Sequence, residues 1–324
     1  MALLLRKRLI LIEKEGDDGS TYGTDPGMDN ATDAVLVRDL SITPQQSDVV
    51  SRDLIRPYLG ASEQLLANTR VECTFSVELA GSGTAGTAPR YHNALEACGL
   101  EENDQSTTVT YTPESSGFSS ITIHYNVDGV LHKVTGCRGS FTLTANVGEI
   151  PSIDFTFTGI YVPPIDSALP SVTYADQATP LIFKNGNTTN FTFLGNSALS
   201  LQSVNFEVGN TTVYRELIGG SKEVLITDRA ATGTLVIEAE PMSTSVRGGS
   251  NLFAASLIDT GLGTNTNLTF QHGTSAGNIV TFTSTRVDLG DLTYSDQDGI
   301  AMLNIPYTAI PSTSGNDEFT LVYS

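Results

Sequence analysis

The sequence predicts a mainly β protein made of two tandem, similar, strand-rich domains, each with one short flanking α-helix. Three observations support this prediction. Apolar and polar residues alternate along most of the chain, two short segments have helical spacing, and residues of the first half recur in order in the second half. The length of 324 residues also suits two domains.

The segment 71–79 illustrates the strand pattern. Its apolar residues, Cys73, Phe75, Val77 and Leu79, alternate with Glu72, Thr74, Ser76 and Glu78, which predicts a strand with one face in a core and the other in water. The same alternation predicts strands at 107–112, 121–127, 141–145, 153–157, 234–239, 278–283 and 303–307.

Turn and helix signals complete the secondary structure. Asp128-Gly129 lies between two apolar runs and favours a two-residue hairpin turn, because both residues tolerate positive φ. Apolar residues at helical spacing predict helices over 91–98 and 252–257. Each precedes a glycine, Gly99 or Gly261, that is typical of a helix C-terminus.

An internal duplication is the most informative feature of the sequence. Arg52-Asp53-Leu54-Ile55 recurs as Arg215-Glu216-Leu217-Ile218, and Glu63 recurs as Glu223. Further matches follow in the same order: Phe75, Val77 and Glu78 with Leu235, Ile237 and Glu238; Tyr91, Leu95 and Gly99 with Phe253, Leu257 and Gly261; Ile153, Phe155 and Phe157 with Leu303, Ile305 and Tyr307.

This duplication predicts four segments: an N-terminal arm (1–33), a first copy (34–170), a linker (171–197) and a second copy (198–324). Equivalent edges of two such copies can pair head to tail, which generates rings. If each copy takes one position of a six-fold ring, three chains close a ring of pseudo-six-fold symmetry.

Composition restricts the partners and the compartment. The net charge of −19 argues against a surface that grips nucleic acid, since such surfaces need clustered Lys and Arg. Three cysteines without a C-x-x-C spacing suggest neither a disulfide framework nor a zinc site. At the N-terminus, apolar residues precede basic ones, the reverse of a signal peptide, so we expect assembly in a cytoplasm and no membrane partner.

Several motifs resemble the tail tube (major tail) proteins of long-tailed bacteriophages, and the likeness covers almost the whole chain. They are Thr21-Tyr22-Gly23-Thr24-Asp25-Pro26, Val35-Leu36-Val37-Arg38, the run from Arg52 to Gly60, the run from Val77 to Pro89, Asp128-Gly129-Val130-Leu131-His132-Lys133, and the run from Tyr294 to Ala301.

The resemblance implies a tandem pair of tail-tube β-sandwich domains, with strands of each copy joining a large barrel that lines a tube. It also implies a structural virion protein of the phage tail, whose stacked rings conduct the genome. The implied partners are further copies of the chain and the tape-measure, tail terminator and distal tail proteins, while DNA passes without specific binding. Many such proteins carry one domain per chain and form hexamers, so the doubling here leaves ring stoichiometry open.

Candidate lumen residues lie on the polar strand faces. An acidic, hydrated wall repels DNA and does not retain it. We therefore expect the lumen to be lined by residues on these faces, with a solvated outer face as the alternative: Glu72, Thr74, Ser76, Glu78, Asp154, Thr156, Glu238 and Asn304.

Candidate contacts between rings lie in the arm and in one hairpin. The arm mixes both charge signs with glycine, which predicts a segment that is mobile until it pairs with a neighbouring ring. Its apolar residues Leu9, Leu11 and Ile12, and the hairpin tip Asp128-Gly129, are the expected contacts.

Signals for chemistry are weak, and we predict no enzyme, cofactor or metal. Gly81-Ser82-Gly83-Thr84-Ala85-Gly86 spells a dinucleotide-binding fingerprint, but the alternating strand before it and the absence of a βαβ unit favour a mobile surface loop. The four histidines lack metal-site spacing, and no G-x-S-x-G motif occurs. The alternatives to a tube subunit are a β-rich binding module, such as an adhesin or capsid decoration protein, and a carbohydrate-active enzyme.

Overall fold

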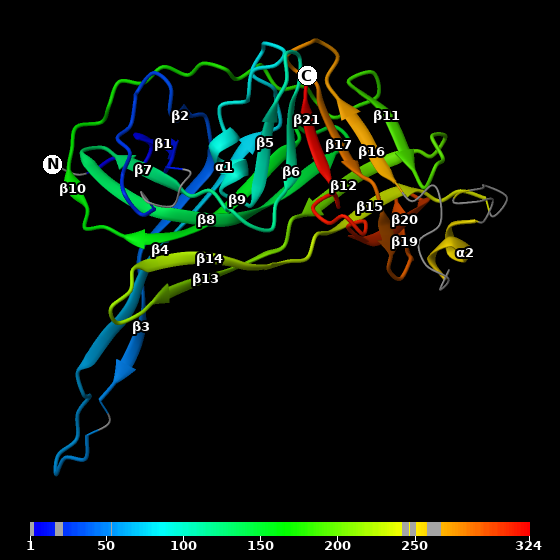
Figure 1. Cartoon of the computed structure of the whole chain (residues 1–324). Coiled ribbons are helices and arrows are strands. Elements are labelled where there is room, and N and C mark those ends of the chain that lie inside the picture. The colour runs from blue at the N-terminus through cyan, green and yellow to red at the C-terminus, as the bar shows by residue number, and fades with distance from the viewer. Residues whose placement is uncertain (1–2, 17–21, 53, 242–245, 247–250, 258–266) are drawn as a thin grey trace.

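Two β-sheets that enclose a shared apolar core make up most of the fold (Figure 1). One long hairpin projects from this body, and a second hairpin runs alongside the larger sheet and packs against it. The structure is a computed structural model that describes residues 3–16, 22–52, 54–241, 246, 251–257 and 267–324. Within these residues no helix is long and apolar enough to cross a bilayer. The predicted mainly β class is confirmed.

The described strands and helices follow one another along the chain as β1 (Arg8–Lys14), β2 (Ala34–Val35), β3 (Arg38–Ser51), β4 (Gln64–Glu78), α1 (His92–Glu96), β5 (Leu100–Asp104), β6 (Val109–Pro113), β7 (Ile121–Val127), β8 (Val130–Asn146), β9 (Ser152–Tyr161) and β10 (Ile165–Asp166). They continue as β11 (Thr188–Phe193), β12 (Leu201–Glu207), β13 (Asn210–Glu216), β14 (Lys222–Arg229), β15 (Thr232–Glu238), α2 (Leu252–Ser256), β16 (Leu268–His272), β17 (Val280–Ser284), β18 (Val287–Leu289), β19 (Thr293–Gln297), β20 (Ile300–Ala309) and β21 (Thr320–Tyr323).

The larger sheet is organised around β8, a strand of 17 residues. One edge of β8 pairs first with β7 and then with β12, while the other edge pairs with β9. From β12 the sheet continues through β15 to β20, which pairs with β18 and β19, and from β9 it continues through β4 to β3. The β8–β12 pairing thus joins the two halves of the chain in one sheet.

The smaller sheet has the order β11-β16-β17-β21-β6-β5. Here too the halves meet directly, because β21 from the C-terminus pairs with β6 and places Leu321 opposite Tyr111. The range expected to be a linker contributes to this sheet through β11, and Phe183 and Phe193 from the same range are fully buried.

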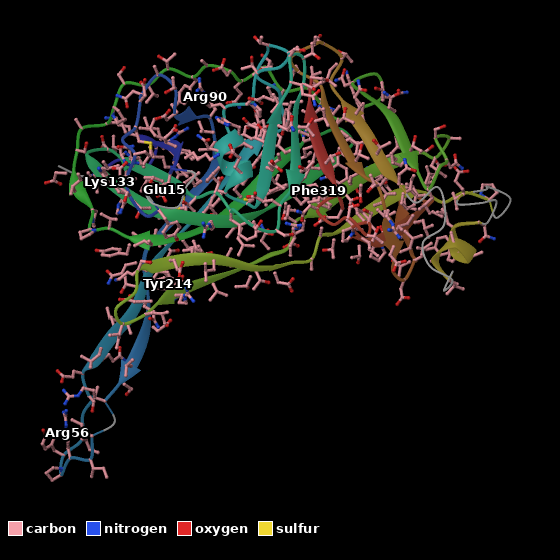
Figure 2. All side chains as sticks on the ribbon, viewed as in Figure 1. Glu15, Arg56, Arg90, Lys133, Tyr214 and Phe319 are labelled. Atoms are coloured by element: carbon pink, nitrogen blue, oxygen red, sulfur yellow. The ribbon has the colours of Figure 1, made fainter. Side chains whose placement is uncertain are left out.

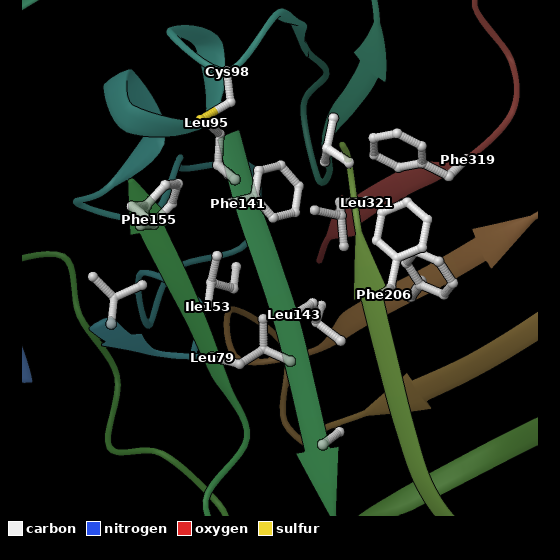
Figure 3. Close-up of a cluster of buried hydrophobic side chains, with 14 of the residues drawn as sticks. Leu79, Leu95, Cys98, Phe141, Leu143, Ile153, Phe155, Phe206, Phe319 and Leu321 are labelled. Carbon is white, nitrogen blue, oxygen red and sulfur yellow. The ribbon is translucent and has the colours of Figure 1, made fainter. Parts of the chain in front are cut away.

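A layer of aromatic rings fills the space between the two sheets (Figure 3). Phe141 of β8 lies between Phe155 of β9 and Phe319. Its ring centroid is 5.9 Å from that of Phe155 and 6.4 Å from that of Phe319. Phe319 in turn packs at 4.7 Å against Phe206 of β12. The two halves therefore share one continuous core, and replacing one of these rings by alanine costs about 3–5 kcal/mol.

The local predictions can be compared with this structure. The strand segments and both short helices are confirmed, although the helices are shorter than expected. Asp128 and Gly129 have φ of +30° and +107°, so the two-residue hairpin turn is also confirmed. Gly261, expected to end the second helix, lies outside the described residues.

The glycine-rich loop after β4 differs from its prediction. Gly81 is buried against the second half, and Gly83 donates its N–H to the carbonyl oxygen of Gly277 at 2.8 Å. A Cβ on Gly81 would lie 2.2 Å from that same oxygen. Glycine is therefore needed here for close packing of two backbones, and the expectation of a mobile surface loop is wrong.

Candidate assembly surfaces

All eight residues expected to line a lumen lie on one face of the larger sheet. They belong to β4, β9, β15 and β20, and in each strand they alternate with residues buried in the core, such as Phe75, Phe155, Leu235 and Ile305. We call this side of the sheet the polar face. Because directly paired residues share a face, one row crosses both halves: Ser76, Asp154, Thr142, Glu207 and Thr232.

The polar face carries more acidic than basic side chains in the strands named above. Asp154 and Glu238 are exposed, and Glu72 and Glu78 are half-buried. Glu207 of β12 adds an exposed carboxylate that is not among the eight predicted residues, although its alternation with the apolar Val204 and Phe206 indicates it. Arg38 of β3 approaches Glu78 at 3.9 Å.

The β3–β4 hairpin projects from the body of the molecule, and Figure 2 shows Arg56 at its far end. Large apolar side chains on it are at least half exposed. Ile55 and Leu59 are completely exposed, at 104% and 102%. A cluster of this kind on a projecting hairpin is typical of a protein–protein contact. The set comprises Val49, Val50, Leu54, Ile55, Tyr58, Leu59, Leu65 and Leu66.

The end of the β13–β14 hairpin resembles the end of the β3–β4 hairpin. Ile218 is fully exposed at 108%, as Ile55 is. Behind each end an arginine forms an ion pair with a glutamate on the opposite side of the hairpin, Arg52 with Glu63 and Arg215 with Glu223. These are the residues that the sequence comparison matched, so the duplicated motif lies at corresponding places in two hairpins.

The expected contacts in the arm need correction. Leu9, Leu11 and Ile12 lie in β1, which pairs with β7 and β2 of the same chain, and the three side chains are at most 8% exposed. They are enclosed by their own chain and do not form a surface for another ring. The apolar run predicts a docking segment, whereas in the structure Ile10 and Ile12 lie in the core and Leu9 and Leu11 lie in a second, smaller cluster.

Glu15, immediately after β1, fixes the arm to the body. Its buried carboxylate accepts hydrogen bonds from the N–H groups of Gly23 and Gly136 and from the hydroxyls of Ser120 and Thr122, each at 2.7 Å. Four donors on one carboxylate hold it in a single geometry. The described part of the arm is therefore docked within the chain, contrary to the prediction of a segment ordered by a neighbour.

The hairpin tip Asp128-Gly129 also meets its own chain. The carboxylate of Asp128 accepts the N–H of Leu4 at 2.9 Å and lies 3.6 Å from the ammonium of Lys7. The carbonyl of Gly129 accepts the N–H of Ser167. Both tip residues nevertheless remain half-buried, not enclosed, so part of the tip is accessible.

A polar cluster beneath β1 brings together His92, Glu96 and Glu102, whose ligand atoms lie within 4.8 Å of one another. The Lys14 ammonium binds Glu96 at 2.5 Å, and the Tyr111 hydroxyl donates to Glu102 at 2.5 Å. Burial by itself lowers the pKa of His92, but its hydrogen bonds to Glu102 and Glu96 and their charges outweigh burial and raise that pKa to about 9. With Lys14 and a protonated histidine bound to these carboxylates, the cluster is a charged network joining α1, β1 and β5.

A groove with a volume of about 580 Å³ lies between β14 and the segment 308–318. Its principal charged groups are already engaged. Arg229 binds the Glu318 carboxylate at 2.6 Å and the Glu114 carbonyl at 2.6 Å. The groove thus presents an ion pair that stabilises the fold, and it brings together none of the residues selected from the sequence.

The fold and these surfaces define a class: a β-rich structural protein whose distinctive features are a polar sheet face and two hairpins with exposed apolar ends. No curated protein matches the chain. A family model described as phage tail tube protein matches residues 18–309 of the 324, and the chain belongs to this family of phage tail components. The resemblance inferred from the sequence is therefore confirmed, and family membership supports a structural role in the phage tail.

Proposed function

We propose that this chain assembles as rings of three subunits, with pseudo-six-fold symmetry, and that the rings stack into a tail tube that conducts the phage genome into the host. The observation that carries the proposal is the polar face, which runs across both halves of the chain opposite the shared core. In this arrangement the polar face lines the lumen, and the subunits assemble in the host cytoplasm with tape-measure, tail terminator and distal tail proteins.

The repeated strand order supports two equivalent ring positions in each chain. The larger sheet contains the series β19-β20-β15-β12 followed by β8-β9-β4-β3. Phe75 lies opposite Phe155 in the second series, and their sequence counterparts Leu235 and Ile305 lie opposite each other in the first. Two series of the same order and register, placed head to tail, are what a pseudo-six-fold trimer requires.

Charge supports the conduit. A chain with a net charge of −19 and exposed carboxylates on the polar face presents DNA with repulsion, whereas a basic wall would hold each phosphate. Hydroxyl and amide side chains between the carboxylates, such as Thr156 and Asn205, keep the surface hydrated. DNA then passes without specific binding.

The two hairpins replace the arm as the contacts between rings in this proposal. Their exposed ends, around Ile55 and Ile218, are too apolar to remain in water at no cost: fully burying one isoleucine stabilises a contact by roughly 2 kcal/mol. Asp128-Gly129 remains a second candidate, with the part of its tip that the chain leaves accessible.

The first test is negative-stain electron microscopy of the concentrated protein, combined with a mass measurement of the smallest oligomer. Tubes or rings with the mass of three chains support the proposal in full. Rings of six chains keep the tube and reject the pseudo-six-fold trimer. A protein that forms neither rings nor tubes, even when supplied with tail initiator proteins, contradicts the proposed function.

A further inference from the structure

Two of the outer strands of the larger sheet, β3 and β19, each present an edge that has no partner among the described residues. Strand β3 pairs with β4 alone, and β19 pairs with β20 alone. Every residue of β19 is exposed, and so are Ser41 and Thr43 of β3. Open edges of this length are templates for pairing with another strand.

The chain itself contains a completed junction of the same kind. Where the two halves meet, β12 pairs with β8 in antiparallel orientation, with Asn205 opposite Thr144 and Glu207 opposite Thr142. On their other edges β12 pairs with β15 and β8 pairs with β9. This junction gives the geometry by which one copy of the repeat joins the next.

The open edge of β19 corresponds to the paired edge of β8. Thr142 of β8 lies opposite Asp154, and Asn304, the counterpart of Asp154 in the second half, lies opposite Thr293 of β19. One further step along, Thr144 lies opposite Ser152 and Ser295 lies opposite Met302. Residues 293–295 therefore occupy the place of residues 142–144.

The open edge of β3 corresponds in the same way to β12. Thr74 of β4 lies opposite Ser41, and its counterpart Thr234 in β15 lies opposite Asn205. Glu72 lies opposite Thr43, and Thr232 lies opposite Glu207. Residues 41–43 therefore occupy the place of residues 205–207.

We propose that β3 of one chain pairs with β19 of a second copy in the register of the internal β8–β12 junction. Ser41 then lies opposite Ser295, Ile42 opposite Tyr294 and Thr43 opposite Thr293 of the neighbouring copy. The proposal rests on the ring proposed above and specifies its contact between chains. It also extends the polar face across that contact, since Ser41 and Thr43 pair with polar-face residues of β4.

The exposure of Tyr294 supports this assignment. Its counterpart Leu143 is completely buried and lies opposite Phe206 of β12, whereas Tyr294 is 60% exposed and has only β20 beside it in the sheet. Ile42, the counterpart of Phe206, is half-buried at the other open edge. Pairing the two edges places these apolar side chains side by side and covers both.

Disulfide trapping tests the register. The variant S41C/S295C places two cysteines directly opposite across the proposed contact, at a Cα separation of about 4.5–5.5 Å, which a disulfide can span. The native Cys73, Cys98 and Cys137 are buried and can stay. A matched control, T144C/N205C, places the same pair at the internal junction, where oxidation links a chain to itself. A second control, S41C/Q297C, samples a register shifted by two residues.

Oxidised assemblies are then compared on denaturing gels without reductant. We expect covalent dimers and closed trimers from S41C/S295C, at least tenfold more than from S41C/Q297C, and monomers from T144C/N205C. Tubes visible by microscopy without such products, or with more product from the shifted pair, overturn the register and leave the tube function standing. If neither the parent protein nor the variants form rings, the proposed function fails instead.

Discussion

The hydroxyl of Tyr22 accepts a hydrogen bond from the N–H of Val224 at 2.6 Å and so ties the N-terminal arm to the β13–β14 hairpin, some 200 residues later in the chain. The same hydroxyl donates to the carbonyl oxygen of Gly136 at 2.9 Å. Arg138 lies over the ring, 5.0 Å from its centroid, and donates to the Val224 carbonyl at 2.8 Å. One phenol therefore links the arm, β8 and β14.

Replacing Tyr22 with phenylalanine keeps the ring beneath Arg138 but leaves the Val224 N–H without its acceptor. We expect a loss of about 1–3 kcal/mol in unfolding free energy and faster hydrogen exchange at Val224 than in the parent protein. Chemical denaturation and exchange mass spectrometry measure both. The exposed Tyr174 serves as the control through Y174F, which we expect to have no effect. Unchanged exchange at Val224 in Y22F would show that the hairpin is held by other contacts.

Glu15→Gln tests whether the arm is fixed by one carboxylate. The amide places an NH₂ group among donors that all point at the original oxygens, so at least one of the four hydrogen bonds is lost. We expect a decrease of about 3 kcal/mol in the free energy of unfolding, together with proteolysis in the arm. Limited proteolysis followed by mass spectrometry locates the cleavage. The same substitution at the exposed Glu101 is the control, and equal stability of E15Q and E101Q would contradict this account of the arm.

The raised pKa of His92 predicts a dependence of stability on pH. Because the folded-state pKa of about 9 exceeds the ordinary value of 6.5, the stabilisation from this group is complete below pH 6.5 and disappears as pH rises through 9. His92→Ala should therefore be less stable than the parent protein at pH 6 and approach it at pH 9.5. Denaturant midpoints at several pH values measure the difference. Burial and Asp33 raise the pKa of Glu13 to about 7, whereas the charge of His92 lowers it, so His92→Ala also changes the titration of Glu13. Comparing H92A/E13Q with E13Q removes that contribution. A difference that does not change with pH would contradict this prediction.

The hairpin ends can be tested without disturbing the fold, because the side chains of Ile55 and Ile218 are fully exposed. We expect I55S and I218S to unfold like the parent protein and to raise the concentration needed for tube growth by about tenfold or more each, given roughly 2 kcal/mol per buried isoleucine. Sedimentation of assembled tubes measures that concentration. Leu257, exposed at 81% on another part of the molecule, supplies the control variant L257S. Normal growth of tubes from both hairpin variants would exclude these ends as ring contacts.

Reversing charge on the polar face tests its position in the tube. Asp154→Lys together with Glu238→Lys should leave ring formation intact, because both side chains are exposed. It should also make tubes retain short double-stranded DNA in a manner that weakens steeply with salt. Filter binding at several salt concentrations measures retention. Glu101→Lys is the control on another strand, and tubes of D154K/E238K that release DNA as the parent does would place these residues outside the lumen.

Much of this architecture could be predicted from alternation alone. A strand such as 71–79 has one wet and one dry face, so the pattern of its residues identifies the core and the polar face without any knowledge of its partners. The repeat that contains Arg52 and Arg215 can also be recognised from the sequence, because it consists of short segments that match each other. The position of these residues near hairpin ends could not be predicted, because the length of a hairpin depends on where its two strands stop pairing.

The errors also have physical causes. Leu9, Leu11 and Ile12 were assigned to a docking segment because the sequence shows that they need burial but not which surface provides it. The partner is β7, more than 100 residues away in the chain. The loop at Gly81 was predicted to be mobile on its composition, whereas its glycines allow two backbones to approach. Close packing of this kind depends on the opposite segment, around Gly277, which no local pattern reveals.

In the proposed ring, the β8–β12 junction changes how assembly depends on protein concentration. In a ring built as proposed, six equivalent contacts are needed, and three of them already exist inside the folded chains. Closure then requires three molecules to meet, whereas a one-domain subunit requires six, and the internal contacts form at the effective concentration set by the connecting chain. Ring formation should therefore fall off with roughly the third power of protein concentration, which lets rings appear at dilutions where a hexamer of single domains would remain dispersed.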